Sequence, residues 1–105
     1  MKRGEIRWCI AADKRRPVVI LTRDSAIGYL SSLTVAPVTT TIRRIPSEVS
    51  LAREDGMPED CVITCDNLLT VPKQSLGPLI ASLSAGKLAA VARAVAFALG
   101  FDEWA

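Results

Sequence analysis

Short strand-like segments follow one another along most of this chain, and a single helical segment comes last. Runs of β-branched and alternating apolar residues are separated by turn-forming residues, which is typical of short β-strands. The expected strands cover residues 4–10, 17–22, 33–42, 45–51, 61–65, 68–71 and 79–83. This pattern predicts a mainly β fold with a C-terminal α-helix, in which the strands form a small closed or nearly closed barrel.

Two details of the strand pattern make sharper predictions. The dense β-branched run at residues 17–22 predicts a strand buried on both faces, with Pro17 at its start because proline cannot donate to a ladder. The polar residues 11–16 before it are expected to form a turn. The alternating segment 45–51 is expected to pair with segment 33–42.

The C-terminal helix has clear end signals. Ser84 is expected to cap a helix over residues 85–99, and Gly100 suits a left-handed C-cap. Leu88, Val91 and Val95 recur at helical spacing, and Leu99 continues the series. This stripe predicts that one helix face packs against the core.

Length and composition limit the organisation of the chain. With 105 residues, half of them hydrophobic, residues 1–105 are expected to form a single domain. The longest apolar run, residues 88–99, is interrupted by Arg93 and is shorter than the roughly 20 residues that a membrane helix needs. Because no secretory segment follows the first residues, we expect a cytoplasmic protein without membrane association.

The chain contains no histidine, which excludes histidine-based nucleophile pairs and histidine-ligated zinc. Its cysteines are Cys9, Cys61 and Cys65, an odd number without a CxxC motif. We expect them to be reduced and packed as small hydrophobic residues. Neither a metal site nor a cofactor is therefore predicted.

Charge is distributed unevenly along the chain. Residues 1–50 carry nine basic and four acidic side chains, whereas residues 51–105 carry four basic and seven acidic ones. Clustered arginine favours binding of a polyanion such as a nucleic acid, although a basic surface can also be simply solvated.

Several short blocks stand in a fixed order along the chain. They are Gly-Glu-Ile at 4–6, Arg-Arg-Pro-Val-Val-Ile at 15–20, Val-Ala-Pro-Val-Thr-Thr at 35–40, Cys-Asp-Asn at 65–67 and Leu-Thr-Val at 69–71. A Ser-capped helix that ends at Gly100 completes the series. Together these blocks resemble the MazF/PemK family of toxins over essentially the whole chain.

The resemblance implies an SH3-like barrel of the CcdB/MazF type, usually a homodimer, that cleaves single-stranded RNA at specific sequences without a metal and so arrests growth. It also implies a cognate, acidic, MazE-like antitoxin. Arg16 matches the family's catalytic arginine and Thr39 its catalytic threonine. One departure is the short connection at residues 11–16, where many members carry a longer loop over the active site.

These two residues suit attack of the RNA 2′-hydroxyl on the adjacent phosphorus, which gives 2′,3′-cyclic phosphate and 5′-hydroxyl ends. Arg16 can donate two hydrogen bonds to phosphate, and Thr39 can donate one. The general base stays open among Glu5, Asp66, water or none.

Further residues are candidates for RNA binding. They are Lys14, Arg15, Arg43, Arg44, Asp66, Asn67 and Lys73. Asp66 is also expected to hydrogen-bond the backbone at a strand turn. Trp8 is expected in the core or a dimer interface rather than as a platform for stacked bases.

Two other functions are compatible with the pattern. CcdB-type toxins share the barrel but poison DNA gyrase through C-terminal residues that include a tryptophan, and this chain ends in Phe-Asp-Glu-Trp-Ala at 101–105. A barrel that binds nucleic acid without cleaving it is the other alternative.

Overall fold

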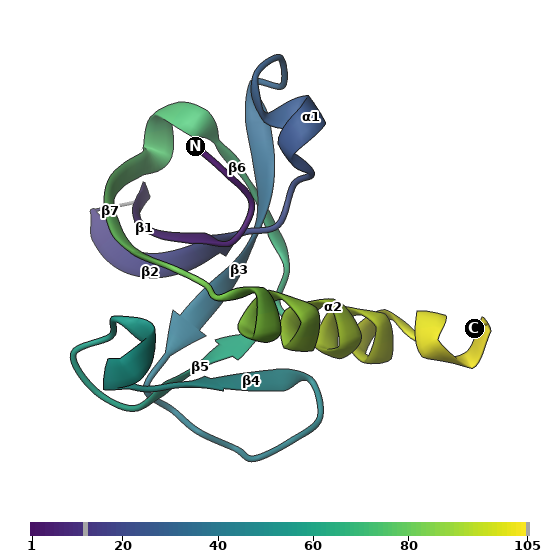
Figure 1. Ribbon diagram of the computed structural model, residues 1–105. Coiled ribbons are helices and arrows are strands. Elements are labelled where there is room, and N and C mark those ends of the chain that lie inside the picture. The colour runs from purple at the N-terminus through teal and green to yellow at the C-terminus, as the bar shows by residue number, and fades with distance from the viewer. Residues whose placement is uncertain (12, 105) are drawn as a thin grey trace.

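The computed structural model describes residues 1–11 and 13–104, which form a curled β-sheet with one long helix (Figure 1). The strands are β1 (Glu5–Ala11), β2 (Lys14–Ile20), β3 (Ser32–Thr39), β4 (Glu48–Leu51), β5 (Cys61–Thr64), β6 (Leu69–Pro72) and β7 (Leu76–Ser82). The α-helices are α1 (Asp24–Ile27) and α2 (Ala85–Leu99), and short 3₁₀ turns are η1 (Arg53–Asp55), η2 (Lys73–Ser75) and η3 (Phe101–Trp104). The predicted mainly β class with a C-terminal helix is confirmed.

The strands are arranged in the order β4-β5-β3-β2-β1-β7, and β6 pairs with the first half of β3. In Figure 1, β1, β2 and β7 curl around one end of the molecule, while β4 and β5 lie at the other, so that the sheet forms a half-barrel. Strand β3 joins the two parts. It pairs with β2 up to Pro37 and with β5 from Val38 onward.

Strands β2 and β3 bury side chains on both faces of the sheet. Val19 and Val38 belong to a cluster that also contains Val91 of α2. Val18 and Ile20 belong to a second cluster, inside the curl of the sheet. The prediction of a strand buried on both faces is therefore confirmed for the apolar part of β2.

The turn predicted for residues 11–16 is wrong for its second half, because β2 begins at Lys14. Ala11 pairs with Lys14, and Asp13 has a left-handed φ of 64°, a conformation that aspartate tolerates. Ala12, which this prediction also covers, lies outside the described residues. Pro17 stands inside β2 opposite Trp8. It is tolerated there because β2 gains its second neighbour, β3, only from Val18.

The predicted pairing of segment 45–51 with segment 33–42 is also wrong. Strand β3 ends at Thr39, and β4 begins only at Glu48. Strand β5 lies between them, and Val49 pairs with Ile63. The alternating apolar residues of β4 are thus buried against β5 instead of β3. The last strand differs as well, since β7 starts at Leu76, which pairs with Cys9 of β1.

Helix α2 has the predicted bounds and caps. The Ser84 hydroxyl accepts a hydrogen bond from the Lys87 backbone N–H at 3.1 Å, and Gly100 has a left-handed φ of 79°. Of the predicted stripe, Val91 is buried, but Leu99 is 51% exposed. The helix packs on the core through Val91 and Ala94, with Val95 and Ala98 beside them, and leaves Phe97 and Leu99 exposed near its C-terminal end.

The remaining sequence predictions of structure concern thiols and membranes. Cys9, Cys61 and Cys65 are free and buried, as expected. Burial, together with the nearby charge of Asp66, raises the pKa of the Cys65 thiol to about 11. No helix in the described part of the chain is long and apolar enough to cross a bilayer.

Candidate functional site

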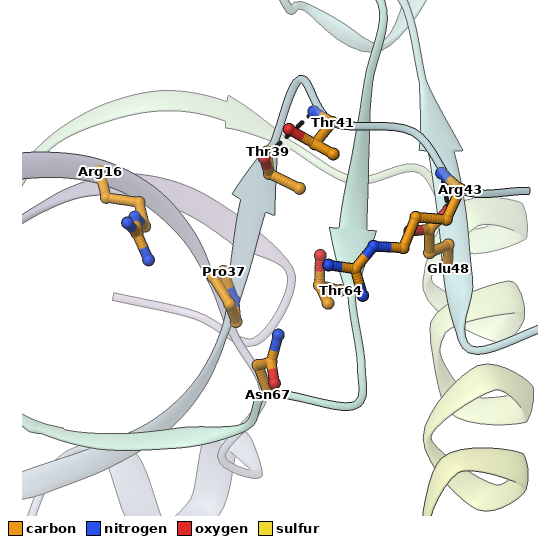
Figure 2. Close-up of a pocket in the computed structure, with 8 residues that line it drawn as sticks. All are labelled: Arg16, Pro37, Thr39, Thr41, Arg43, Glu48, Thr64 and Asn67. Atoms are coloured by element: carbon orange, nitrogen blue, oxygen red, sulfur yellow. Dashed lines mark hydrogen bonds between the residues drawn. The ribbon is translucent and has the colours of Figure 1, made fainter. Parts of the chain in front are cut away.

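A cavity of about 240 Å³ opens where β3 changes its partner from β2 to β5 (Figure 2). Its lining comes from β2, β3, the loop after β3, β4, β5 and the turn after β5. The lining residues are Arg16, Pro37, Thr39, Thr41, Arg43, Glu48, Thr64 and Asn67. Residues far apart in the sequence are thus brought together by the split in the sheet.

Arg16 and Thr39 lie on the two strands that separate at this point. Val18 pairs with Pro37, and two further steps of this antiparallel register would set Arg16 opposite Thr39. The strands no longer pair there, because Thr39 pairs with Val62 of β5 instead. In Figure 2 the two side chains stand on either side of the opening that results.

The Thr39 hydroxyl is oriented by its own loop. Its Oγ1 accepts a hydrogen bond from the Thr41 backbone N–H at 3.1 Å. A hydroxyl that accepts through one lone pair still has its proton to donate. Thr39 can therefore donate a hydrogen bond to a group that enters the cavity.

Glu48 holds the loop on the opposite wall. Its Oε1 accepts hydrogen bonds from the backbone N–H groups of Arg43 and Arg44, each at 3.0 Å. Arg44 has a left-handed φ of 58°, which turns the chain back towards β4. The Arg43 side chain extends from this loop across the cavity towards Thr64 (Figure 2).

The far side of the cavity is formed by β5 and the turn that follows it. Thr64 pairs directly with Glu48 across β4 and β5 and is only 7% exposed. The next turn is fixed because Ser47 Oγ donates to Asp66 Oδ2 at 2.5 Å. This bond replaces the backbone contact expected for Asp66. Asn67 follows Asp66 and turns its amide into the cavity (Figure 2).

The charges of the lining suit an anionic ligand. Two guanidinium groups, those of Arg16 and Arg43, face the cavity from opposite walls, against the single carboxylate of Glu48 among the described lining residues. Guanidinium groups bind phosphate oxygens through paired N–H donors. The cavity can thus hold a phosphodiester beside Arg16, with the second positive charge of Arg43 on the facing wall.

A second cavity of about 320 Å³ adjoins the first and shares Arg16 and Thr39 with it. Trp8 lies in this second cavity, outside both core clusters, and the Arg15 guanidinium lies 4.3 Å from its ring centroid. Of the two places predicted for Trp8, the core is therefore wrong, and a dimer interface stays a prediction. Arg16 and Thr39 therefore lie where the two cavities meet, and one cavity extends to each side of this pair.

The structure brings together some of the predicted site residues and not others. Arg16, Thr39, Arg43 and Asn67 line the main cavity, and Arg15 lines the adjacent one. The other candidates lie elsewhere. Lys14 begins β2, and Asp66 contacts Ser47. Arg44 lines a separate cavity with Glu54, Asp55 and Asp60, and Lys73 Nζ donates to the Ile27 carbonyl at 2.7 Å.

Glu5, one candidate general base, is engaged elsewhere. It forms an ion pair with Arg7 at 2.9 Å and does not line the cavity. Burial alone would raise the pKa of Glu5, but its hydrogen bonds and the Arg7 charge outweigh burial and lower it.

Sequence patterns do not single out Glu48 and Thr64, which the structure adds to the site. Glu48 looks like an ordinary polar position of an alternating strand. Thr64 gives a weak signal, since it places a hydroxyl in the otherwise apolar segment Cys-Val-Ile-Thr-Cys. Only the pairing of β4 with β5 shows that the two residues are neighbours.

Comparisons with known proteins agree on one family. Residues 2–99 match the family described as PemK-like, MazF-like toxin of type II toxin-antitoxin system. Endoribonuclease MazF3 of Mycobacterium tuberculosis (strain ATCC 25618 / H37Rv) is 41% identical over 90 residues, which cover 86% of this chain and 87% of that protein.

Solved structures show the same likeness in three dimensions. Mycobacterium tuberculosis toxin MazF-mt6 has a TM-score of 0.85 at 38% identity, over 91% of this chain and 96% of that chain. A MazE-MazF structure from Deinococcus radiodurans gives a TM-score of 0.81 at 25% identity, with 95% of both chains covered. The expected MazF-type fold is therefore confirmed, and this chain belongs to the PemK-like, MazF-like family of toxins of type II toxin–antitoxin systems.

Proposed function

We propose that this chain is a toxin that cleaves single-stranded RNA in the cavity between Arg16 and Arg43. The enzyme class follows from the relatives, which are curated as endoribonucleases. The observation that carries the proposal is the convergence of Arg16 and Thr39, from two separating strands, on one cavity. Sequence-specific cleavage and growth arrest are parts of the same proposal.

The proposed chemistry is transfer of the phosphodiester to the neighbouring 2′-hydroxyl. The 2′-oxygen bonds to phosphorus, the bond to the 5′-oxygen breaks, and one proton leaves the 2′-hydroxyl while another reaches the 5′-oxygen. Arg16 stabilises the charge on the phosphoryl oxygens, and Thr39 donates one further hydrogen bond. The products carry 2′,3′-cyclic phosphate and 5′-hydroxyl ends.

Proton removal is assigned to solvent water. Glu5 and Asp66 lie outside the cavity and are engaged by Arg7 and Ser47. Glu48 lines the cavity, but its carboxylate is engaged by the backbone N–H groups of Arg43 and Arg44. Catalysis then depends on orientation and on the positive charge of Arg16, and we expect slow turnover. No metal is required for any of these steps.

The RNA strand is proposed to follow the two adjoining cavities. Arg15 and Arg43 flank the central pair on either side, and Asn67 lies at one edge. Lys14 extends this basic path along β2. Contacts of RNA with Arg44, Asp66 and Lys73 stay a prediction, since these residues lie outside both cavities.

Regulation by an acidic, MazE-like antitoxin and assembly as a homodimer are proposed as well. A segment with negative charge would compete with RNA for the basic path. Support for the antitoxin comes from the related MazE-MazF structure of Deinococcus radiodurans. The dimer is favoured by the apolar residues that α2 leaves exposed, among them Phe97 and Leu99.

One observation favours a second function. Trp104, in the C-terminal turn, is 82% exposed, as a gyrase poison that acts through its C-terminus would require. Ala105, which is part of that predicted segment, lies outside the described residues.

Cleavage of RNA in excess EDTA tests the main proposal. Purified protein is incubated with a pool of single-stranded RNA, and the new ends are identified by their reactivity with kinase and phosphatase. We expect cleavage with 2′,3′-cyclic phosphate and 5′-hydroxyl ends. Activity that vanishes in EDTA and returns with magnesium would contradict the mechanism, and an intact RNA pool under all conditions would contradict the function.

A further inference from the structure

Thr64 has a buried hydroxyl that the fold does not use. Its Oγ1 is buried and has no hydrogen-bond partner among the described residues. Buried polar groups nearly always have a partner, and one without a partner destabilises the folded state. Valine would fill the same space without this disadvantage. A functional reason for a threonine at this position is therefore needed.

The position of Thr64 points to a ligand. The residues of β5 alternate between the two faces of the sheet, so that Cys61, Ile63 and Cys65 join the core cluster beneath α2. Thr64 lies on the opposite face and lines the cavity that contains Arg16 and Thr39. Figure 2 places it between Asn67 and the guanidinium of Arg43, across the cavity from Arg16.

The Arg43 side chain, which extends towards Thr64 in Figure 2, is able to move. Arg43 is exposed, and its side chain makes no hydrogen bond or ion pair within the described residues. Its backbone is fixed to Glu48, but its long side chain can change rotamer without breaking a contact of the fold. A planar group that enters the cavity can therefore displace the guanidinium and reach the Thr64 hydroxyl.

The surroundings of Thr64 match the edge of a nucleobase better than a phosphate. Glu48, its cross-strand neighbour, offers acceptors only, Arg43 offers donors only, and Asn67 offers both. A phosphodiester presents only acceptors at its charged oxygens, and the Glu48 carboxylate would repel it. A base edge presents donors and acceptors side by side, and single-stranded RNA exposes that edge to proteins.

We propose that Thr64 is a specificity-determining residue whose hydroxyl hydrogen-bonds the edge of a base adjacent to the cleaved phosphate. The inference rests on the proposed RNA cleavage and extends it. Arg16 and Thr39 hold the phosphate on one side of the cavity, and Thr64, with Asn67 and Glu48, selects the neighbouring base on the other. A site that hydrogen-bonds a base in this way discriminates against bases that lack the matching group.

Thr64→Val tests the inference, because it removes the hydroxyl and keeps the shape. Thr64→Ser retains the hydroxyl, and Thr70→Val makes the same change at an exposed position of β6, away from the cavity. Thermal unfolding shows whether each variant folds. Since Thr64 Oγ1 has no partner, we expect the Tm of Thr64→Val to equal or exceed that of the wild type.

The decisive readout is the sequence profile of cleavage on a random RNA pool. We expect Thr64→Val to lose about tenfold in kcat/KM for the preferred sequence and to lose the preference at one position beside the cut. Thr64→Ser and Thr70→Val should keep the wild-type profile. The wild type should cleave an RNA that lacks the base at that position more slowly than the intact RNA, by a similar factor. Thr64→Val should cleave these two RNAs at the same rate.

Two results would overturn the inference. A Thr64→Val variant that cleaves with the wild-type rate and sequence profile would refute it. A loss that is equal for all sequences would show a contact with the RNA backbone and would refute the assignment to a base. Both results leave the proposed function intact, whereas failure of the wild type to cleave any RNA would contradict that function itself.

Discussion

Replacement of Glu48 should loosen the loop that carries Arg43. One carboxylate oxygen, Oε1, accepts the backbone N–H groups of both Arg43 and Arg44, each at 3.0 Å. Glu48→Ala removes both hydrogen bonds, whereas Glu48→Gln keeps a side-chain oxygen that can accept them. Glu54→Ala, in η1, removes an exposed carboxylate away from the site and serves as the matched control.

The expected magnitude follows from the number and exposure of these bonds. A hydrogen bond contributes about 0.5–1.5 kcal/mol to the free energy of unfolding, and both bonds are accessible to water, so we expect about 1 kcal/mol for the pair. For a domain of this size, that loss lowers the Tm by about 4–8 °C. The backbone of the loop that carries Arg43 is then no longer anchored, so its guanidinium is less well positioned at the cavity. We expect kcat/KM for RNA cleavage to fall by about tenfold.

Thermal unfolding and cleavage of a single RNA substrate measure the two effects on the same preparations. Glu48→Ala should lose both stability and rate, Glu48→Gln should recover most of the stability, and Glu54→Ala should match the wild type. If Glu48→Ala resembles Glu54→Ala in Tm and in rate, the loop is held by other contacts, and the role given to Glu48 is refuted.

Other predictions concern the thiols, a carboxylate and the C-terminus. Burial and the charge of Asp66 raise the pKa of Cys65 to about 11, so iodoacetamide should not label this thiol in native protein at pH 8, as measured by mass spectrometry. Rapid labelling without unfolding would contradict its burial. The lowered pKa of Glu5 means that its charge stabilises the folded state above the unfolded-state pKa and loses this effect as the pH falls through the folded-state pKa. The Tm difference between wild type and Glu5→Gln should therefore shrink from pH 7 to pH 3, and a constant difference would refute the linkage. Removal of Trp104 and Ala105 should leave both RNA cleavage and growth arrest intact; loss of growth arrest with intact cleavage would favour the gyrase-poison function.

The position of α2 could be predicted from the sequence because its ends depend on local signals. The helix from Ala85 to Leu99 was predicted to the residue, because Ser84 and Gly100 mark its ends through local hydrogen bonds and backbone conformation. Polar residues led to a wrong prediction where a strand is exposed. Lys14, Arg15 and Arg16 look like a turn, yet they extend β2, since a two-stranded ribbon can carry polar side chains on exposed faces.

The geometry of the site depends on long-range pairing, which local patterns do not encode. Arg16 and Thr39 could be named through resemblance to a family, but their meeting depends on the change of partner in β3 after Pro37. Glu48 and Thr64 become neighbours only because β5 inserts beside β4. The predicted pairing of segment 45–51 with segment 33–42 would place Glu48 beside β3 and not beside Thr64. The wall of the cavity that faces Arg16 could therefore not be predicted.

The single-turnover rate of RNA cleavage by Arg16 variants tests the central claim most directly. With protein in excess over one RNA substrate in EDTA, Arg16→Ala should lower the rate by about 100- to 1,000-fold at an unchanged Tm. Arg16→Lys should recover little, since lysine lacks the paired donors, and Arg53→Ala, which removes an exposed arginine of η1, should retain the full rate. An Arg16→Ala variant that is folded and cleaves at the wild-type rate would contradict the account of this site.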